Sequence, residues 1–492
     1  GKMSNALPRI AAELDGMLNY SWAIAIPFLV SAFSTLIFSK LSDLFGRRIM
    51  LLTSVSFMLL GAVLSATAIT FIWLIASLSI FSLGMGAIQP LCFSVLGDLF
   101  APVERSRWAG LLNISSGVSA IVAPTLGGWV VDTLHWSVIF WMDVPVILLT
   151  GILILIGLPH QNQRRSHPID VPGMFLLAVA STSMIIGLSW AGSTYPWVSP
   201  QVLGLLGLSL VSWLVFLRME SGAEEPVLDT RLLSNRTFLV ASLSALLSTF
   251  GFTALLSYYP LFLQGVQGTS AALSGKIITP FSVIMSFMGI PAGFLLARTK
   301  RYKWMLVTGY IILFLVMSGM VLLREETPLF WGVIISTMAG IGLGTIPTIN
   351  ALIIQYAVPR KSIGVAMGGL YFFVAMGKAI GPAILGSVFN SVYISRLSFH
   401  FDRILPEKLT HTTMALIRDP SVLLSSSATQ ALQKELNLLG DQGSLFIQNV
   451  LAAVRLSLES GLRATFLVGA ISMLLALLLI LTIPVINLEE LQ

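Results

Sequence analysis

Apolar runs of about 20 residues recur along the whole chain, and no other feature limits its possible folds as strongly. A helix of that length rises about 30 Å, which is the thickness of the hydrocarbon core of a bilayer. Backbone groups in lipid must find hydrogen-bond partners within the protein, and strands of a barrel would be about half as long and would alternate in polarity. We therefore predict an all-α, multi-pass integral membrane protein.

Composition excludes several other classes. Hydrophobic residues make up 56% of the 492 residues and charged residues 10%, whereas a soluble domain carries about 25% charged residues. The net charge of +6 does not indicate a nucleic-acid partner, because the basic residues lie at the ends of apolar runs. The single cysteine, Cys92, excludes an intramolecular disulfide, and five scattered histidines have no metal-ligand spacing. We expect no cofactor and no metal.

Thirteen complete spans and one partial span are predicted. The segment 1–8 is too short and too polar to cross a membrane, and we interpret it as the outer end of a first helix that is truncated in this chain. The complete spans are expected at 20–39, 49–69, 71–92, 108–131, 137–157, 172–191, 200–217, 237–262, 273–297, 304–323, 329–355, 364–392 and 464–484.

The loops that join these spans differ in charge. Two basic residues, Arg9 and Arg324, fall on one side, and 16 fall on the other. Positively charged loops stay in the cytoplasm, so we expect the second set to be cytoplasmic, together with both termini of the intact protein. We place the protein in a plasma membrane, the inner membrane of a bacterium. The 16 are Lys40, Arg47, Arg48, Arg105, Arg107, Arg164, Arg165, Arg218, Arg231, Arg236, Arg298, Lys300, Arg301, Lys303, Arg360 and Lys361.

Three segments outside the spans stand out. Residues 158–171 and 218–236 are predicted cytoplasmic linkers on either side of two isolated helices. Residues 393–463 are predicted to form a long external loop. Within it, 427–438 and 445–458 have apolar residues at helical spacing, which indicates either amphipathic helices on the outer face or a partly ordered loop.

The most distinctive local pattern is SKLSDLFGRR at 39–48, between two spans. Asp43 is able to accept hydrogen bonds from free N–H groups at the start of a neighbouring helix, where the helix dipole favours an anion. Gly46 suits a tight turn, and Arg47 and Arg48 are able to pair with acids on adjacent loops. We expect these charges to be solvent-exposed, each contributing at most about 1 kcal/mol to stability. The alternative is an ordinary positive loop with a turn glycine.

This segment resembles motif A of the major facilitator superfamily, and further matches follow in order. LGDLF at 96–100 and ERSR at 104–107 are similar to the family's loop after helix 4, with Asp98, Glu104, Arg105 and Arg107. APTLGG at 123–128 resembles motif C of exporters, with Pro124, Gly127 and Gly128. HWSVIFWMDVP at 135–145 and YPLFLQ at 259–264 resemble the entry to helix 6 and the end of helix 9 in the fourteen-helix drug:proton antiporter branch.

The resemblance implies a fold and a function. Two six-helix bundles are expected at 1–157 and 237–492, with two extra helices at 158–236 between them. The bundles would rock about a substrate site near the membrane midplane. We expect a monomeric secondary exporter of small amphipathic molecules, exchanging them for protons across the lipid bilayer. Small residues such as Gly127 and Gly128 permit close helix approach, either for gating or for plain packing.

The sequence also departs from the family pattern. Ser39 stands in place of the first glycine of motif A, and Leu78 stands where helix 4 usually carries an arginine tied to proton coupling. The second, weaker copy of motif A at 293–298 has Ala297 where an acid could stand. The aspartate of helix 1 would precede Gly1. The residues therefore support export more directly than proton antiport.

Lys378 is the one ionisable residue predicted near the middle of a span. Placing a charge there costs at least about 2.5 kcal/mol, so it normally faces a cavity or a partner. In a functional role, Lys378 would bind an anionic group of the substrate or titrate during coupling. In a structural role, its ammonium group would donate hydrogen bonds to backbone carbonyls and water. The other substrate or coupling candidates are Asp143, at the outer end of a helix, and the aromatic residues Tyr258, Tyr371 and Phe372.

Two other functions stay open. The same fold would serve a dedicated exporter of one metabolite, such as a siderophore or a lipid precursor. A protein of another class, a membrane sensor or scaffold that transports nothing, would use the loop at 393–463 as its binding surface. We do not expect an enzyme, since the sequence has no nucleotide loop and no paired carboxylates at membrane depth.

Overall fold

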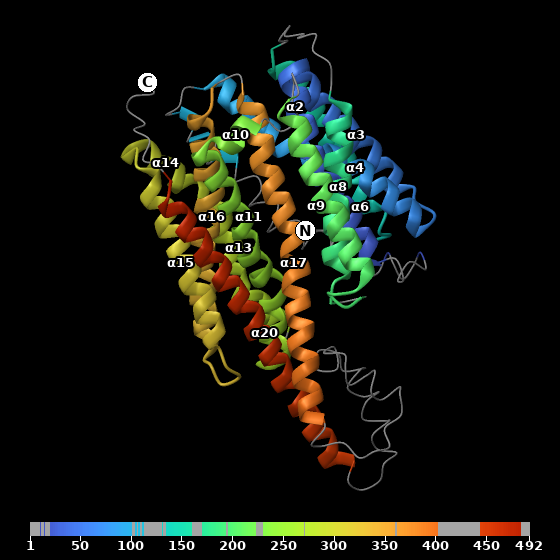
Figure 1. The fold of residues 1–492 in the computed structure, drawn as a ribbon, viewed down its shortest axis with the longest axis vertical. Helices are drawn as coiled ribbons and strands as arrows, with labels where there is room; N and C mark the ends of the chain where they lie inside the picture. Colours follow the sequence, from blue (N-terminus) through green and yellow to red (C-terminus); the bar gives the residue numbers. More distant parts are fainter. Residues whose placement is uncertain are drawn as a thin grey trace.

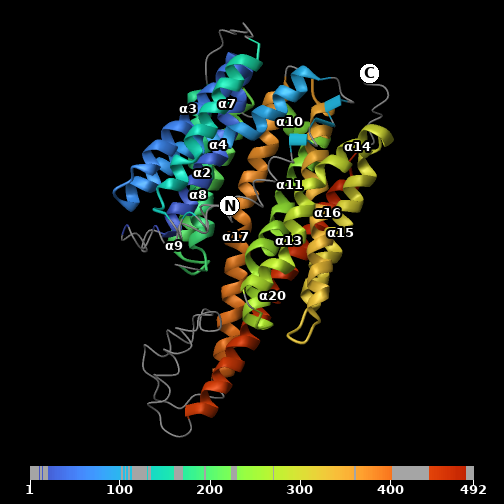
Figure 2. The same ribbon diagram turned by 180° about the vertical axis from the view of Figure 1, so that it is seen from behind.

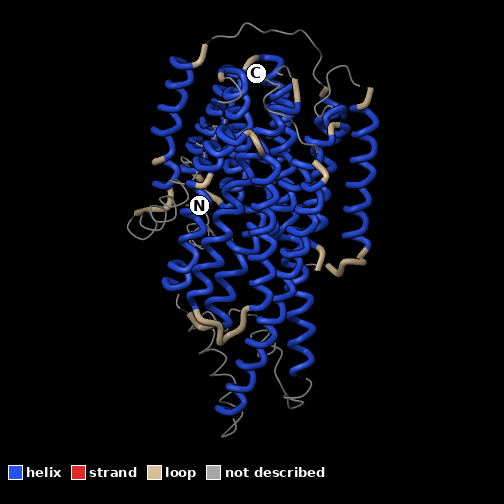
Figure 3. Tube along the Cα trace, turned by 90° about the vertical axis from the view of Figure 1, so that its left-hand side faces the viewer, coloured by secondary structure: helices blue, strands red, loops and turns tan. Residues whose placement is uncertain are grey.

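The computed structural model describes residues 20–100, 134–159, 170–192, 195–222, 230–269, 271–359, 362–401 and 443–483, with a few residues between 10 and 14 and between 104 and 130. Every regular element in these ranges is a helix (Figure 3). Eleven described helices are long and apolar enough to cross a membrane, and the apolar stretch Pro172–Leu188 adds a shorter one. Each coincides with a predicted span; the remaining prediction, 108–131, falls largely outside the described residues.

The first helices form one group (Figure 1). Small residues hold it together: an added Cβ on Gly61 of α3 would meet the backbone of Phe81, and one on Gly84 of α4 would meet the backbone of Ser54. Helices associate in lipid through close backbone approach of this kind, because burial of apolar surface provides little driving force for association there. The helices are α2 (Tyr20–Phe45), α3 (Arg47–Ala66), α4 (Phe71–Leu99), α6 (Val138–Trp141) and α7 (Asp143–Gly157).

Helices α8 (Val171–Trp190) and α9 (Pro200–Glu220) form a hairpin. Each starts with a capping side chain and a proline in its first turn, which suits the free N–H groups of a helix start. The hairpin packs on α2 and α17 through a cluster that includes Leu36, Phe216 and Phe372. The tryptophan of its turn, Trp197, donates a hydrogen bond to Ser387 of α17.

The remaining helices form a second group. After α11, Pro260 lies in a run of π-helical and α-helical turns, since proline cannot supply the backbone donor of a regular α-helix. The elements are α10 (Thr230–Ser234), α11 (Arg236–Thr253), η2 (Ala254–Tyr258), α12 (Tyr259–Leu261), η3 (Phe262–Val266), α13 (Ala271–Phe287), α14 (Gly289–Thr299), α15 (Tyr302–Leu322), α16 (Leu329–Ala357), α17 (Ile363–Phe401) and α20 (Gly443–Leu481).

Helix α17 lies between the two groups in both face-on views (Figures 1 and 2). It packs on α11 and α20 of its own group and on α2 and α4 of the other. We call the end of the molecule where α2, α4 and α14 finish and α17 begins the basic end, because most of the basic residues that the structure describes lie there.

The prediction of an external loop over 393–463 is wrong at both of its ends. Residues 393–401 continue α17 and residues 443–463 begin α20, each helix having 39 residues. Such a helix is roughly 58 Å long, far longer than the hydrocarbon core, and both extend away from the basic end (Figure 1). The segment 445–458 is therefore part of α20 rather than a separate surface helix. The segment 427–438 lies outside the described residues.

A buried stripe explains why these extensions are helical. In the first part of α20 the side chains of Val450, Val454, Leu458 and Leu462 are all fully buried, at a constant spacing of four residues that places them on one helix face. Polar residues such as Gln448, Asn449 and Arg455 occupy other positions there, so the segment is less apolar than the predicted spans. Packing of α20 on α17 and α15 supplies the core that an isolated segment would lack.

Candidate functional site

The turn between α2 and α3 requires glycine. Gly46 has φ 93° and ψ 149°, a conformation that is strained for any residue with a Cβ. It directs α3 to start immediately after α2 ends, so that Asp43, in the last turn of α2, and Arg47, in the first turn of α3, face each other. The tight turn that the sequence predicts at this position is confirmed.

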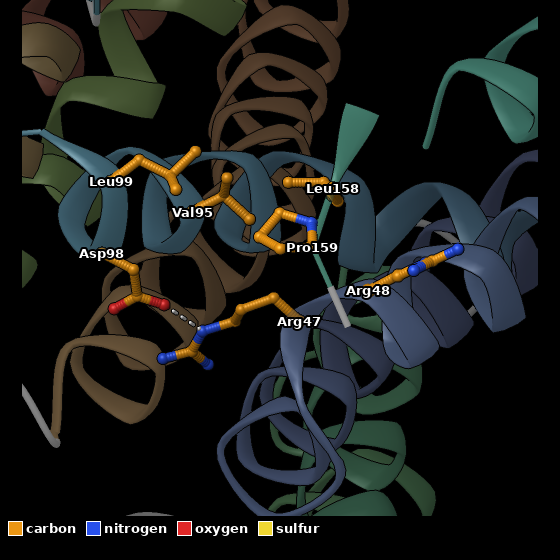
Figure 4. A pocket seen from close by; sticks show the side chains of 7 residues that line it. All are labelled: Arg47, Arg48, Val95, Asp98, Leu99, Leu158 and Pro159. Atoms are coloured by element: carbon orange, nitrogen blue, oxygen red, sulfur yellow. Dashed lines mark hydrogen bonds and ion pairs between the residues drawn. The ribbon is translucent and has the colours of Figure 1, made fainter. Parts of the chain in front are cut away.

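Arg47 joins two carboxylates from different helices. Its guanidinium pairs with Asp43, four residues earlier, and its Nε lies 2.9 Å from Oδ2 of Asp98 in the last turn of α4. Arg47 also donates to the hydroxyl of Ser42. Figure 4 shows its side chain reaching toward Asp98. One cation thus ties the ends of three helices at the basic end.

Asp43 makes the contact that crosses between the two groups of helices. Its Oδ2 accepts a hydrogen bond of 2.9 Å from the backbone N–H of Val365, in the first turn of α17. The first N–H groups of a helix have no partners within the helix, and the dipole there is positive. The sequence predicts such a contact for Asp43 and does not identify the helix. We call Asp43, Arg47, Asp98 and the Val365 amide the clasp.

Two glycines let α17 come close enough for the clasp. A Cβ added to Gly364 would collide with the carboxylate of Asp43 and the guanidinium of Arg47. A Cβ added to Gly368 would collide with the side chain of Ser39, which is fully buried. The sequence has Ser39 where motif A begins with glycine; in the structure Gly368 of α17 provides the room. Sequence reasoning missed both glycines, although their spacing of four residues is typical of close helix packing.

A second contact between the groups lies at the end of α4. Arg105 is buried and donates to the carbonyls of Gly97 and Phe100, which are the unpaired carbonyls of a helix C-terminus. A Cβ on Gly97 would lie 3.1 Å from Ile363 and 3.2 Å from the amide oxygen of Gln355, which is 3% exposed near the end of α16. Gln355 was not predicted, since nothing in its sequence surroundings marks it.

The other residues of the two loop motifs do not join the clasp. Arg48 points away from Arg47 (Figure 4) and donates to the carbonyl of Leu155 in α7 at 2.8 Å, and no acidic residue that the structure describes pairs with it. Glu104 is exposed, and the guanidinium of Arg107 lies 5.6 Å from the ring centre of Phe294. The motif residues Pro124, Gly127 and Gly128 lie outside the described residues.

The expectation that these charges are solvent-exposed is also wrong. The side chains of Asp43 and Arg47 are 12% and 9% exposed, and that of Asp98 is 24% exposed. The first turn of α17 covers Asp43 and Arg47, with Gly364 against both side chains and the Val365 amide on Asp43. Sequence reasoning placed them in a short loop and had no means of knowing that a distant helix would lie over it.

Four of the five predicted substrate or coupling residues fall in different places. The ring of Tyr371 lies 5.7 Å from Phe93 of α4, with its hydroxyl in hydrogen-bonding reach of Gln89. Phe372 is buried against Trp213 of α9, so it packs against the hairpin. The ring of Tyr258 lies 5.9 Å from that of Phe389 in a tilted arrangement, and Asp143 begins α7 at the end opposite the clasp.

Lys378, the fifth, lies near the middle of α17 and its side chain is exposed. It makes no hydrogen bond or ion pair with any residue that the structure describes. Among those same residues no group of three histidine, cysteine or acidic side chains is placed to hold a metal ion.

Two groups of membrane helices that meet through charged loops at one end define a membrane transporter of the two-bundle type. Residues 3–382 match the sequence profile described as Major Facilitator Superfamily, and the chain belongs to this superfamily.

Individual relatives agree with this assignment. The chain is 31% identical over 393 residues to multidrug transporter protein MdtP of Bacillus subtilis, covering 79% of this chain and 72% of the relative. It is 29% identical over 403 residues to multidrug resistance protein 3 of the same organism, covering 81% and 78%. The solved proton:xylose symporter XylE has the same fold, with a TM-score of 0.56 at 11% identity, covering 100% of this chain and 94% of that one.

Proposed function

We propose that this protein exports small amphipathic molecules by alternating access, with its basic end in the cytoplasm and protons as the counter-ion. The observation that carries the proposal is the bond from the Val365 amide to Asp43, which joins the two groups of helices. The neighbouring contacts at Gly364, Gly368 and Gly97 lie at the same end. This arrangement corresponds to a transporter closed toward the cytoplasm.

The chemistry of the clasp suits a joint that opens and closes. A carboxylate at a helix N-terminus contributes about 0.3–1 kcal/mol, and up to about 2 kcal/mol when partly buried. A contact of this size biases an equilibrium between two arrangements without locking it. Because Arg47 and Asp98 remain in the first group when α17 leaves, Asp43 keeps a cationic partner in the open state. The clasp thus avoids an unpaired buried charge in either state.

The substrate class and the coupling ion have separate support. Relatives named as multidrug transporters favour a broad range of small amphipathic molecules. Proton exchange follows only from the resemblance to the drug:proton antiporter branch. Leu78, at the position where that branch carries an arginine, is buried among apolar residues of the first group, so a coupling residue has to lie elsewhere in this chain.

The test is transport by the purified protein in proteoliposomes with an imposed pH gradient and a panel of cationic and anionic fluorescent dyes. We expect uptake of several dyes that stops when the gradient is collapsed. The variant Asp43→Asn keeps the shape and removes the charge, and we expect it to reduce the rate at least about tenfold, as a shift of 1.4 kcal/mol does. No movement of any dye would favour a sensor or scaffold, and movement independent of the gradient would refute proton exchange.

A further inference from the structure

We propose that Lys378 forms a binding subsite for an anionic group of the substrate, in the space between the two groups of helices. This inference rests on the proposed function and specifies its substrate class: amphipathic molecules that carry a carboxylate, sulfonate or phosphate. Three observations carry it: the direction in which Lys378 projects, the exposure of its side chain, and the lack of a partner among the described residues.

The direction follows from the neighbours of Lys378 on α17. Tyr371 lies seven residues earlier, which is two helical turns and a difference in direction of only about 20°. Tyr371 contacts Phe93 and Gln89 of α4, in the other group of helices. Lys378 therefore projects toward the same group, about 10 Å farther from the clasp along the helix axis.

The other faces of α17 at this level are covered. A Cβ on Gly377 would collide with Leu246 and Thr249 of α11, and Met376 is buried in the cluster formed with α2 and the α8–α9 hairpin. Lys378 lies on the remaining side and is exposed there. An exposed side chain on the inner side of a helix that is packed on its other sides lines a space between the groups rather than facing lipid.

No described acid is placed to neutralise this lysine. The acidic residues that the structure describes lie at or near helix ends, such as Asp43, Asp98 and Asp143, or beside the outer residue Arg324, as Glu459 does. Snorkelling does not reach water beyond the membrane, since Lys378 is about 23 Å along the helix from Ile363 at 1.5 Å per residue. A charge at this depth needs a counter-charge or water, and an anionic substrate supplies the counter-charge.

The remaining lining fits an amphipathic anion. Gln89, on the facing surface of α4, offers an amide, and Met85, one turn away on α4, is 59% exposed. Methionine adapts its shape to different apolar groups. A fixed cation beside adaptable apolar surface selects for charge while tolerating variation in the apolar part of the ligand.

The test is equilibrium dialysis of the purified full chain with dansylglycine, an anion, and with dansylglycinamide, its uncharged counterpart. We expect the wild type to prefer dansylglycine. Lys378→Met should weaken dansylglycine binding about tenfold or more, the usual effect of one hydrogen bond to a charged group, and leave dansylglycinamide binding unchanged. Lys378→Arg should retain the preference. Lys276→Met, which removes an exposed lysine in the second turn of α13, is the matched control.

Three results would overturn the inference: equal binding of both probes by the wild type, unchanged dansylglycine binding by Lys378→Met, or parallel loss of both probes in that variant, which would mark a structural lysine. Dialysis measures binding without transport, so the two proposals fail separately. Selective binding without flux in proteoliposomes would refute export alone, and flux without any anion preference would refute the subsite alone.

Discussion

At the scale of single residues, the arrangement around Arg47 shows how one buried cation can organise three helix ends. Arg47 lies between Asp43 and Asp98, so that two carboxylates share one guanidinium. The remaining capacity of Asp43 is used by the Val365 amide. A buried charge that loses its partner is costly, while an intact buried pair adds little to stability. The cluster therefore contributes mainly by fixing the orientation of the three helix ends.

Replacing Arg47 by alanine should destabilise the protein. The change leaves Asp43 and Asp98 close together without their cation, and breaking a buried pair in this way costs about 3–5 kcal/mol. Arg48→Ala is the control, because Arg48 contacts only a carbonyl among the described residues and its loss should cost at most about 1 kcal/mol. Thermal unfolding of both variants in detergent measures the difference. Equal unfolding temperatures would show that the ion pairs of Arg47 make no net contribution to stability.

The residues of the clasp were only partly predictable from the sequence. An acid, a glycine and two arginines within 39–48 indicate a charged turn, and the need for a helix N-terminus beside Asp43 follows from the chemistry of a carboxylate. The partner, Val365, is 322 residues away. A single sequence contains no signal that relates two such distant positions, so Gly364, Gly368 and Gln355 were missed.

At the scale of helices, span positions were predictable and helix ends were not. Twenty apolar residues indicate a spanning helix whatever its neighbours are, because lipid leaves the backbone no alternative. Outside the membrane this constraint disappears. The extension of α20 is stabilised by contacts with α15 and α17 and by the pair of Arg455 with Glu325 beside the α15–α16 turn. Hydropathy averaged over a window does not detect a helix of that kind.

Two leucines in the extension of α20 test this point. Leu458 is fully buried and Leu456 is 50% exposed, two residues apart on the same helix. We expect Leu458→Ala to lower the free energy of unfolding by about 2–5 kcal/mol, the range for a buried leucine, and Leu456→Ala to have little effect. Thermal unfolding in detergent measures both. If 443–463 were a loop, the two variants would behave alike.

At the scale of the whole molecule, two groups of helices meet at the basic end through α17, with the clasp and the Gly97–Gln355 contact side by side. Everything proposed here about transport requires these contacts to break and re-form. Ser39 is a suitable reporter of that event, because it is fully buried against Gly368 of the other group. Ser54, equally buried within the first group, is the matched control.

The most direct measurement is the rate at which an impermeant thiol reagent modifies a cysteine at position 39, in a Cys92→Ser background. In inside-out membrane vesicles, whose cytoplasmic face is outward, we expect slow modification of Ser39→Cys and at least about tenfold faster modification when Asp43→Asn is added, because 1.4 kcal/mol changes an equilibrium tenfold. Right-side-out vesicles should show none of this acceleration, and Ser54→Cys should stay slow throughout. Equal rates at position 39 with and without Asp43→Asn would contradict the account.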